Sequence, residues 1–230
     1  MSSTYFIILA GGRGARLGND TPKQFMDLGG MPVIAWSMRA CATVPEISGL
    51  ILVCPEDERG RVESIAASHG RGLVRAIVAG GETRQGSVYN ALSALPFADD
   101  DILLFHDAAR PFIGPGIISR CVMETAAHGA AAVYVRATDT ITRGDGGFVE
   151  SIPPRDALFA AQTPQGFRYA VIRAAHERAR AAGLFDASDD VRLVMESGVR
   201  VKMVEGEYRN LKITTAFDYD VARMIAGQYR

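Results

Sequence analysis

The sequence predicts an α/β domain built on a mainly parallel, twisted sheet with helices on both faces. Short apolar runs recur along the chain, as they do in strands that are buried on both faces of a sheet. Segments whose apolar residues have helical spacing lie between these runs. This alternation is typical of a doubly wound sheet, and 230 residues with 48% hydrophobic content are enough to bury its core. We therefore expect residues 1–230 to form one Rossmann-like domain.

The strands are expected in the apolar runs. These are residues 7–10, 50–53, 74–78, 102–105 and 130–135, with residues 201–204 as a further candidate. Apolar stripes that predict helices are formed by Ile34, Met38 and Cys41, by Val88, Ala91, Leu92 and Leu95, and by Phe217, Val221, Met224 and Ile225. Two more helical patterns cover residues 169–182 and 189–197, and the hydroxyl of Ser188 is suited to cap the second.

Polar, glycine-rich segments follow three of the predicted strands. They are residues 10–25, 79–87 and 106–111. The carboxyl ends of parallel strands meet at one edge of a sheet, and ligands bind there. We therefore expect the three segments to line one cleft. Residues 162–167 are expected to form another loop.

The first of these segments has the composition of a phosphate-binding loop. Gly11, Gly12 and Gly14 lack a Cβ and let backbone N–H groups approach an anion. From Gly12 the pattern is G-x-G-x-x-x-G, which misses the dinucleotide fingerprint by one residue, and no Gly-Lys-Ser/Thr closes a P-loop. The glycines alone also fit a structural turn between a strand and a helix. The positive charges of Arg16 and Lys23 favour phosphate binding.

A hairpin arm is expected at about residues 137–156. Residues 139–152 form two β-like runs about a Gly-Asp-Gly-Gly turn, and prolines at 153 and 154 end the pairing. A lone hairpin is marginal in water and gains stability by packing against something. The arm is therefore a candidate contact for a homodimer, and folding of the arm onto its own domain is the alternative.

Composition and charge exclude several classes of protein. The formal net charge is -1 and the sequence pI is about 6.4, whereas nucleic-acid binders usually carry a basic excess, so no nucleic-acid partner is expected. Cys41, Cys54 and Cys121 are widely spaced and fit neither a disulfide framework nor a zinc site. No apolar run approaches the ~20 residues of a membrane span, and the N-terminus lacks the features of a signal peptide. The sequence predicts a soluble, cytoplasmic protein.

A series of short motifs runs through the polar segments. They are Ala-Gly-Gly-Arg-Gly-Ala-Arg at 10–16 with Pro-Lys-Gln at 22–24, Gly-Gly-Glu-Thr-Arg-Gln-Gly-Ser-Val at 80–88, His-Asp-Ala-Ala-Arg-Pro at 106–111, Asp-Thr at 139–140, Arg155, Gln-Thr-Pro-Gln at 162–165, Ser-Asp-Asp at 188–190, and Val-Glu-Gly at 204–206 with Asn-Leu-Lys at 210–212. In this order they resemble the cytidylyltransferase family of the non-mevalonate isoprenoid pathway, whose members join CTP to 2-C-methyl-D-erythritol 4-phosphate. The resemblance covers almost the whole chain. It departs from the usual pattern at Ala-Gly-Gly, where many members have Ala-Ala-Gly, and at Ser188, where Thr is usual.

The resemblance implies direct attack of a polyol phosphate on the α-phosphorus of CTP, with release of pyrophosphate. It assigns stabilisation of the transition-state charge to Arg16, Lys23 and Lys212. It implies that CTP is held by Ala10, Gly11, Gly12, Arg13, Gly14, Gly81, Glu82, Ser87 and Ala108, and that the polyol phosphate is held by Asp107, Arg110, Thr140, Arg155 and Ser188. Thr140 and Arg155 would reach the acceptor from the partner subunit of a homodimer. The implied cofactor is Mg²⁺ on the CTP phosphates, with no direct side-chain ligand and with Asp107 near it.

The chemistry of the side chains is consistent with these roles but leaves structural interpretations open. A guanidinium such as that of Arg155 binds a phosphate in bidentate fashion, and the carboxylate of Asp107 suits diol hydroxyls or a metal-bound water. Alternatively, Asp107 caps a helix and pairs with Arg110, and Lys212 is a surface lysine. We expect His106 to be structural, because the implied chemistry requires no histidine.

Three other functions stay open on the sequence. Ala-Gly-Gly at 10–12, Ile-Pro-Pro-Arg-Asp at 152–156 and Leu-Lys-Ile-Thr-Thr at 211–215 also resemble the enzymes that activate ribitol 5-phosphate, whereas the motifs at 83–88 and 107–110 are closer to the isoprenoid enzymes. A nicotinamide-dependent dehydrogenase is a second alternative, and the glycine spacing counts against it. A non-catalytic nucleotide-binding module is a third, and the cations argue against it.

Overall fold

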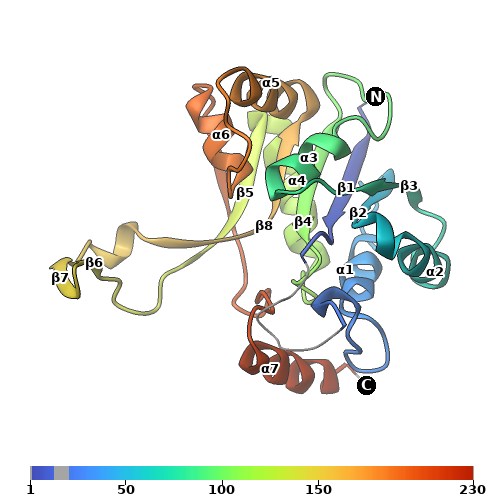
Figure 1. The fold of residues 1–230 in the computed structure, drawn as a ribbon, viewed down its shortest axis with the longest axis horizontal. Helices are drawn as coiled ribbons and strands as arrows, with labels where there is room; N and C mark the ends of the chain where they lie inside the picture. Colours follow the sequence, from blue (N-terminus) through green and yellow to red (C-terminus); the bar gives the residue numbers. More distant parts are fainter. Residues whose placement is uncertain (1, 13–20, 230) are drawn as a thin grey trace.

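The computed structural model describes residues 2–12 and 21–229, and their architecture confirms the predicted fold class. The main sheet has seven strands in the order β3-β2-β1-β4-β8-β5-β9 (Figure 1). The strands are β1 (Thr4–Leu9), β2 (Gly49–Cys54), β3 (Val74–Ala79), β4 (Ile102–Asp107), β5 (Ala130–Arg136), β8 (Phe159–Arg168) and β9 (Lys202–Glu205). Each predicted strand, including the candidate at 201–204, overlaps one of these elements. The β1–β2, β1–β4, β2–β3 and β5–β9 pairs are parallel.

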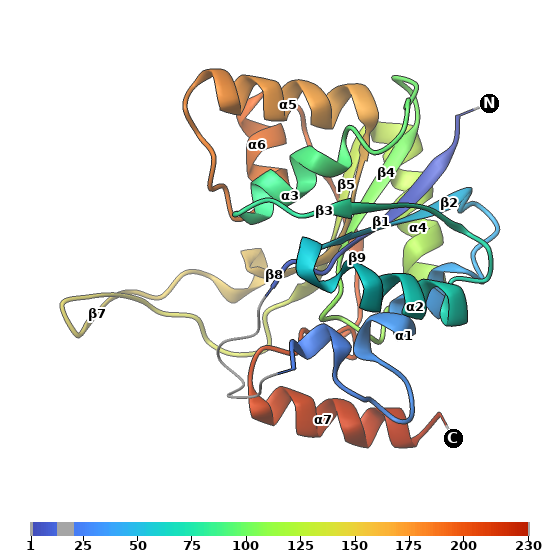
Figure 2. The same cartoon turned by 45° about the vertical axis from the view of Figure 1, so that its right-hand side comes forward.

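Helices cover both faces of this sheet (Figure 2). They are α1 (Val33–Cys41), α2 (Arg59–His69), α3 (Arg84–Ala91), α4 (Pro115–His128), α5 (Tyr169–Ala181) and α6 (Asp190–Glu196). A further helix, α7 (Ala216–Gly227), lies beyond the end of the sheet. Because successive side chains of a strand point to opposite faces, Phe6 and Ile8 of β1 pack in the core with α1, α2 and α4. Ile7 packs in the other core with α3, α5 and α6. The continuous apolar run of β1 is therefore explained by burial on both faces.

The expectation of a loop at residues 162–167 is wrong, because these residues lie within β8. This strand pairs antiparallel with both β4 and β5. The glycine and the glutamines, which give this stretch the composition of a loop, are explained by the tertiary contacts of the strand. A Cβ at Gly166 would clash with the Thr125 hydroxyl and approach the Cys121 sulfur to 3.3 Å. Gln162 and Gln165 are buried because their side-chain amides have hydrogen-bond partners.

Three further expectations are corrected by the structure. Asp189, and not Ser188, caps α6, and its side chain accepts a hydrogen bond from the backbone N–H of Val191. The predicted stripe of α7 does not face the core as a whole, since Phe217 and Met224 are each 75% exposed. This helix instead buries two alanines in a cluster that includes Leu28, which precedes α1, and Phe112, which follows β4. β3 is an edge strand and is only partly buried.

The hairpin is present and projects away from the sheet (Figures 1 and 2). β6 (Arg143–Asp145) pairs antiparallel with β7 (Phe148–Ser151). Two glycines with positive φ form the turn between them. The arm leaves the sheet after β5 and returns to it at β8, its immediate neighbour.

The described residues contain three buried, unpaired cysteine thiols, as expected. Within the same residues, no helix combines the length and the apolar composition that a membrane crossing requires.

Candidate functional site

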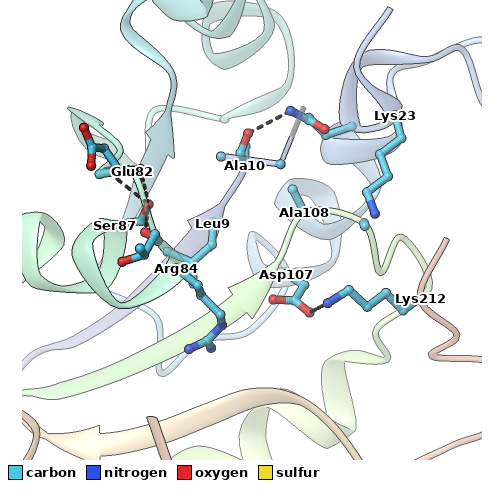
Figure 3. Close-up of a pocket in the computed structure, with 15 residues that line it drawn as sticks. Leu9, Ala10, Lys23, Glu82, Arg84, Ser87, Asp107, Ala108 and Lys212 are labelled. Atoms are coloured by element: carbon cyan, nitrogen blue, oxygen red, sulfur yellow. Dashed lines mark hydrogen bonds and ion pairs between the residues drawn. The ribbon is translucent and has the colours of Figure 1, made fainter. Parts of the chain in front are cut away.

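A cavity of about 320 Å³ opens where β1 and β4 end and where β3 leads into α3 (Figure 3). Its lining comes from four separate parts of the chain. The lining residues are Leu9, Ala10, Gly11, Gly12, Lys23, Gln24, Gly81, Glu82, Thr83, Arg84, Ser87, Asp107, Ala108, Ala109 and Lys212. The expectation that polar segments after strands would line one cleft is confirmed for these described residues.

Most of the residues singled out in the sequence lie together in this cavity. Ala10, Gly11, Gly12, Lys23, Gly81, Glu82, Ser87, Asp107, Ala108 and Lys212 are all in its wall. Arg13, Gly14 and Arg16 lie outside the described residues. The structure thus brings together lysines that are far apart in sequence.

Four of the residues assigned to the polyol phosphate are not in the cavity wall. Arg110 is buried, and its guanidinium donates to the backbone carbonyls of Asn210 at 2.7 Å and Ala161 at 3.2 Å. Thr140 and Arg155 are exposed on the arm, and Ser188 is exposed before α6. Within one copy of the chain, the side chain of Arg110 therefore ties the loop after β4 to the backbone of Asn210 and Ala161, and it is not part of the cavity wall.

Lys23 is held in place by a short 3-10 helix, Lys23–Phe25, which follows Pro22. The Lys23 ammonium donates to the carbonyl of Ile213 at 2.9 Å. Its neighbour Gln24 is buried and donates from its amide to the carbonyl of Ala10 at 2.7 Å. This bond fixes the end of β1 to the segment that carries the lysine.

The second wall of the cavity is a tight turn that only glycine can form. A Cβ on Gly81 would lie 2.7 Å from the carbonyl carbon of Gly86, so the two backbones are in contact. The Ser87 hydroxyl accepts from the N–H of Gly81 at 3.1 Å and donates to the carbonyl of Thr83 at 3.0 Å. Backbone groups beside this turn are consequently held close to the cavity.

Asp107 is a carboxylate in the cavity wall, at the end of β4. Lys212 donates to it at 2.8 Å (Figure 3). The guanidinium Nε of Arg110 lies 3.9 Å from it. Burial alone would raise the pKa of Asp107, but the charges of Lys212 and Arg84 outweigh it and hold this pKa below its usual range. Asp107 is therefore an anion that accepts hydrogen bonds.

His106 lies behind the cavity and orients Asp107 indirectly. Arg110 contributes a carbonyl, which only accepts, so His106 Nε2 carries the proton and donates to it at 3.0 Å. His106 Nδ1 then accepts from the Thr163 hydroxyl at 2.9 Å. The same hydroxyl accepts from the N–H of Asp107 at 3.2 Å. This series of hydrogen bonds agrees with the structural role expected for His106.

Sequence reasoning gave no role to Arg84 or Gln24, although both line the cavity. Both belong to the motifs that carry the resemblance, and their place in these motifs could have identified them as site residues. Arg84 is paired with Asp190, another motif residue without an assigned role. In the described part of the chain, no three His, Cys, Asp or Glu side chains are grouped so that they could hold a metal ion.

Comparison with known proteins gives a consistent family. A family model described as "IspD: 2-C-methyl-D-erythritol 4-phosphate cytidylyltransferase" matches residues 4–228. A protein of that name from Geotalea uraniireducens is 42% identical over 214 residues, which are 92% of this chain and 91% of the relative. One from Geobacillus kaustophilus is 42% identical over 219 residues, which are 95% of each chain.

Solved structures of similar name have the same fold. A 4-diphosphocytidyl-2C-methyl-D-erythritol synthase from Anaerococcus prevotii superposes with a TM-score of 0.85 at 30% identity, covering 98% of this chain and 96% of that one. A 2-C-methyl-D-erythritol 4-phosphate cytidylyltransferase from Thermus thermophilus gives a TM-score of 0.78 at 33% identity, covering 99% and 100%.

The burial of His106 predicts a pH dependence of stability. Burial lowers the pKa of His106 from 6.5 to about 4. Between these two pH values, His106 is protonated in the unfolded chain but stays neutral in the folded chain. The free energy of unfolding should be constant near pH 7.5 and fall by up to about 3 kcal/mol between pH 6.5 and 4 through this residue. Urea unfolding at several pH values measures this free energy. His106→Gln should flatten this part of the profile, and an unchanged slope in that variant would contradict the prediction.

Proposed function

The chain belongs to the 2-C-methyl-D-erythritol 4-phosphate cytidylyltransferase family, and on that premise we propose how its cavity performs the reaction. The protein is a CTP-dependent nucleotidyltransferase that transfers CMP from CTP to 2-C-methyl-D-erythritol 4-phosphate in isoprenoid precursor biosynthesis. Family membership favours this activity over the dehydrogenase, the non-catalytic module and the ribitol phosphate enzyme. The observation that carries the mechanism is the meeting of Lys23, Lys212 and Asp107 in one cavity with the glycine turn.

CTP occupies the cavity between the glycine loop and the turn that contains Gly81. Backbone groups of residues 10–14, together with Glu82, Ser87 and Ala108, hold the nucleotide. Support for this placement comes from the close packing of Gly81 against Gly86, which brings backbone donors and acceptors to the cavity surface. Backbone atoms at fixed positions discriminate one base from another by their pattern of donors and acceptors.

The reaction forms a bond between a phosphate oxygen of the acceptor and the α-phosphorus of CTP. The bond from the α-phosphorus to the oxygen that bridges to the β-phosphorus breaks, and pyrophosphate leaves with the electron pair. Negative charge increases around the α-phosphorus in the transition state, and fixed cations stabilise it without rearranging. Lys23, Lys212 and Arg16 perform this role, and the hydrogen bond of Lys23 to Ile213 keeps its ammonium in position.

Asp107 accepts hydrogen bonds from substrate hydroxyls, as a charged carboxylate does. Thr140 and Arg155 bind the acceptor in the cavity of a second copy, and Ser188 binds it from the segment before α6. For Arg110 we revise the direct role to a supporting one, because its guanidinium is occupied by two backbone carbonyls. Those bonds hold the segment of Asn210 against the loop that carries Asp107.

Mg²⁺ fits a cavity of this composition when it arrives on the triphosphate. Magnesium binds phosphates and one or two carboxylates and keeps several waters, so it needs no cluster of protein ligands. Asp107, as a charged carboxylate in the wall, would hold such an ion through a water. When bound, such an ion would neutralise part of the triphosphate charge.

Pyrophosphate release measured with two acceptors tests the proposed function. With CTP and Mg²⁺, turnover should require 2-C-methyl-D-erythritol 4-phosphate, be negligible with ribitol 5-phosphate, and stop when EDTA removes the metal. Preference for ribitol 5-phosphate would replace the assigned acceptor. Absence of turnover with both acceptors would refute the enzymatic role.

Replacing Lys23 by alanine should lower kcat about 100-fold or more, because it removes a cation that acts on transition-state charge. The chain has three lysines, and Lys202 is an exposed one outside the cavity. Lys202→Ala is therefore the matched control and should keep full activity. Circular dichroism and thermal unfolding check that both variants are folded. Near-normal kcat in Lys23→Ala would remove Lys23 from the mechanism.

The arm should join two copies of the chain, because its apolar side chains have no cover within one copy. Phe148 is 82% exposed and Val149 is 67% exposed. Light scattering at micromolar concentration should give the mass of a dimer, and Phe148→Glu should shift the mass toward that of a monomer. Phe217→Glu changes an equally apolar exposed residue on α7 and should not alter the mass. A monomeric wild-type protein would refute the dimer.

A further inference from the structure

A buried chain of charges lies behind the cavity on the side of α3. Arg84 is the first residue of α3, and its guanidinium pairs with Asp190, the first residue of α6. The side chain of Asp190 is only 1% exposed, and its other oxygen accepts from His176 Nε2 at 2.9 Å. His176 is fully buried on α5, and its Nδ1 has no partner among the described residues. Three elements thus meet at one carboxylate.

The network fixes Arg84 more tightly than a surface ion pair would. Burial opposes the charge of Asp190, but Arg84 and His176 outweigh it and hold the pKa of Asp190 below its usual range. Arg84 also lies 3.4 Å from the side-chain oxygen of Gln165, whose amide donates to Asp189 at 2.9 Å. Burying such a pair contributes little net stability, because desolvation offsets the attraction. A specific position for the guanidinium is what the network provides.

This position lies between two carboxylates. Arg84 lines the cavity, and its charge acts on Asp107 as well as on Asp190. Figure 3 shows Arg84 reaching from α3 towards the end of β4, while Lys212 meets Asp107 from the other side. Asp190 pairs directly with Arg84, whereas Asp107 pairs with Lys212. The guanidinium therefore stays in the wall and leaves one side of Asp107 to a ligand.

Arg84 is a fixed hydrogen-bond donor and Asp107 a fixed acceptor in the wall of the same cavity. A hydroxyl group, which both donates and accepts, matches this pair. The hydroxyl hydrogen is donated to Asp107, and the hydroxyl oxygen accepts from Arg84. A vicinal diol fits such a pair best, since it offers both functions on adjacent carbons. Both substrates carry hydroxyls, so the ribose of CTP and the polyol are the two possible sources.

We propose that Arg84 is a substrate-binding residue that donates to a substrate hydroxyl opposite Asp107, and that Asp190, supported by His176, is a positioning residue that keeps Arg84 from closing onto Asp107. This inference rests on the proposed cytidylyltransferase function and adds two residues to its site. Without the charge of Asp190, the strongest remaining partner for the Arg84 guanidinium is Asp107. Their pairing would occupy the carboxylate that the substrate needs.

Steady-state kinetics of Arg84→Ala and Asp190→Asn test the proposal. Each variant should lower kcat/KM about 10- to 100-fold, the usual loss for a hydrogen bond to a charged group, mainly through a higher KM. If the ribose is the source, the KM for CTP rises and Arg84→Ala loses the wild-type preference for CTP over 2′-deoxy-CTP and 3′-deoxy-CTP. If the polyol is the source, the KM for the acceptor rises and that preference stays. Unchanged KM values for both substrates would overturn the proposal.

The double variant separates positioning from a general structural effect. If Asp190 acts through Arg84, adding Asp190→Asn to Arg84→Ala should change kcat/KM less than about threefold, because coupled residues are not additive. Full additivity would assign Asp190 a separate structural role and overturn the positioning claim. If Asp190→Asn does not fold, Asp190→Glu keeps the charge and displaces it, and it should show the same rise in KM.

Two controls distinguish this inference from the function on which it rests. Glu196→Gln removes a carboxylate from the exposed Arg192–Glu196 pair on the same helix and should leave kinetics and thermal unfolding unchanged. Wild-type protein without turnover would refute the proposed function. Active wild-type protein with unaffected Arg84→Ala and Asp190→Asn variants would refute only the inference.

Discussion

The polar stretch of β8 holds the functional cavity together. Thr163 receives the N–H of Asp107 and bonds to His106, while its own carbonyl accepts from Asn210 in the segment that leads to Lys212. Gln165 in turn connects Arg84 with the start of α6. A buried polar group without a partner costs free energy, so each of these bonds restricts where its loop can lie. One strand thereby sets the spacing between the walls of the cavity.

The charges around the cavity alternate in sign. Lys212 contacts Asp107, Asp107 is acted on by Arg84, and Arg84 contacts Asp190. Each buried charge has an opposite neighbour, and this arrangement offsets the penalty of removing it from water. The same order keeps the groups in place before a substrate arrives. Fixed charges stabilise a developing charge without the reorganisation that water would require.

The sequence predicted the elements that depend on local pattern. The apolar runs became strands because both faces of the sheet are covered, and the loops after them met because parallel strands end at one edge. β8 was missed because its glycine and glutamines serve tertiary contacts with α4, α6 and the segment after β9. Tertiary partners of this kind leave no periodic signal. The pairing of Arg84 with Asp190 joins residues 106 positions apart, so it too was invisible to local reasoning.

The two ends of the arm are hydrogen-bonded neighbours. Arg136 is paired with Phe159 at the edge of the β5–β8 ladder, and the N–H of Ala137 donates to the carbonyl of Leu158 at 3.0 Å. An insertion that starts and finishes at adjacent backbone positions leaves the register of the sheet independent of its length. The arm is in this respect an exchangeable module: a different hairpin grafted between residues 137 and 158 would leave the pairing of β5 with β8 unchanged.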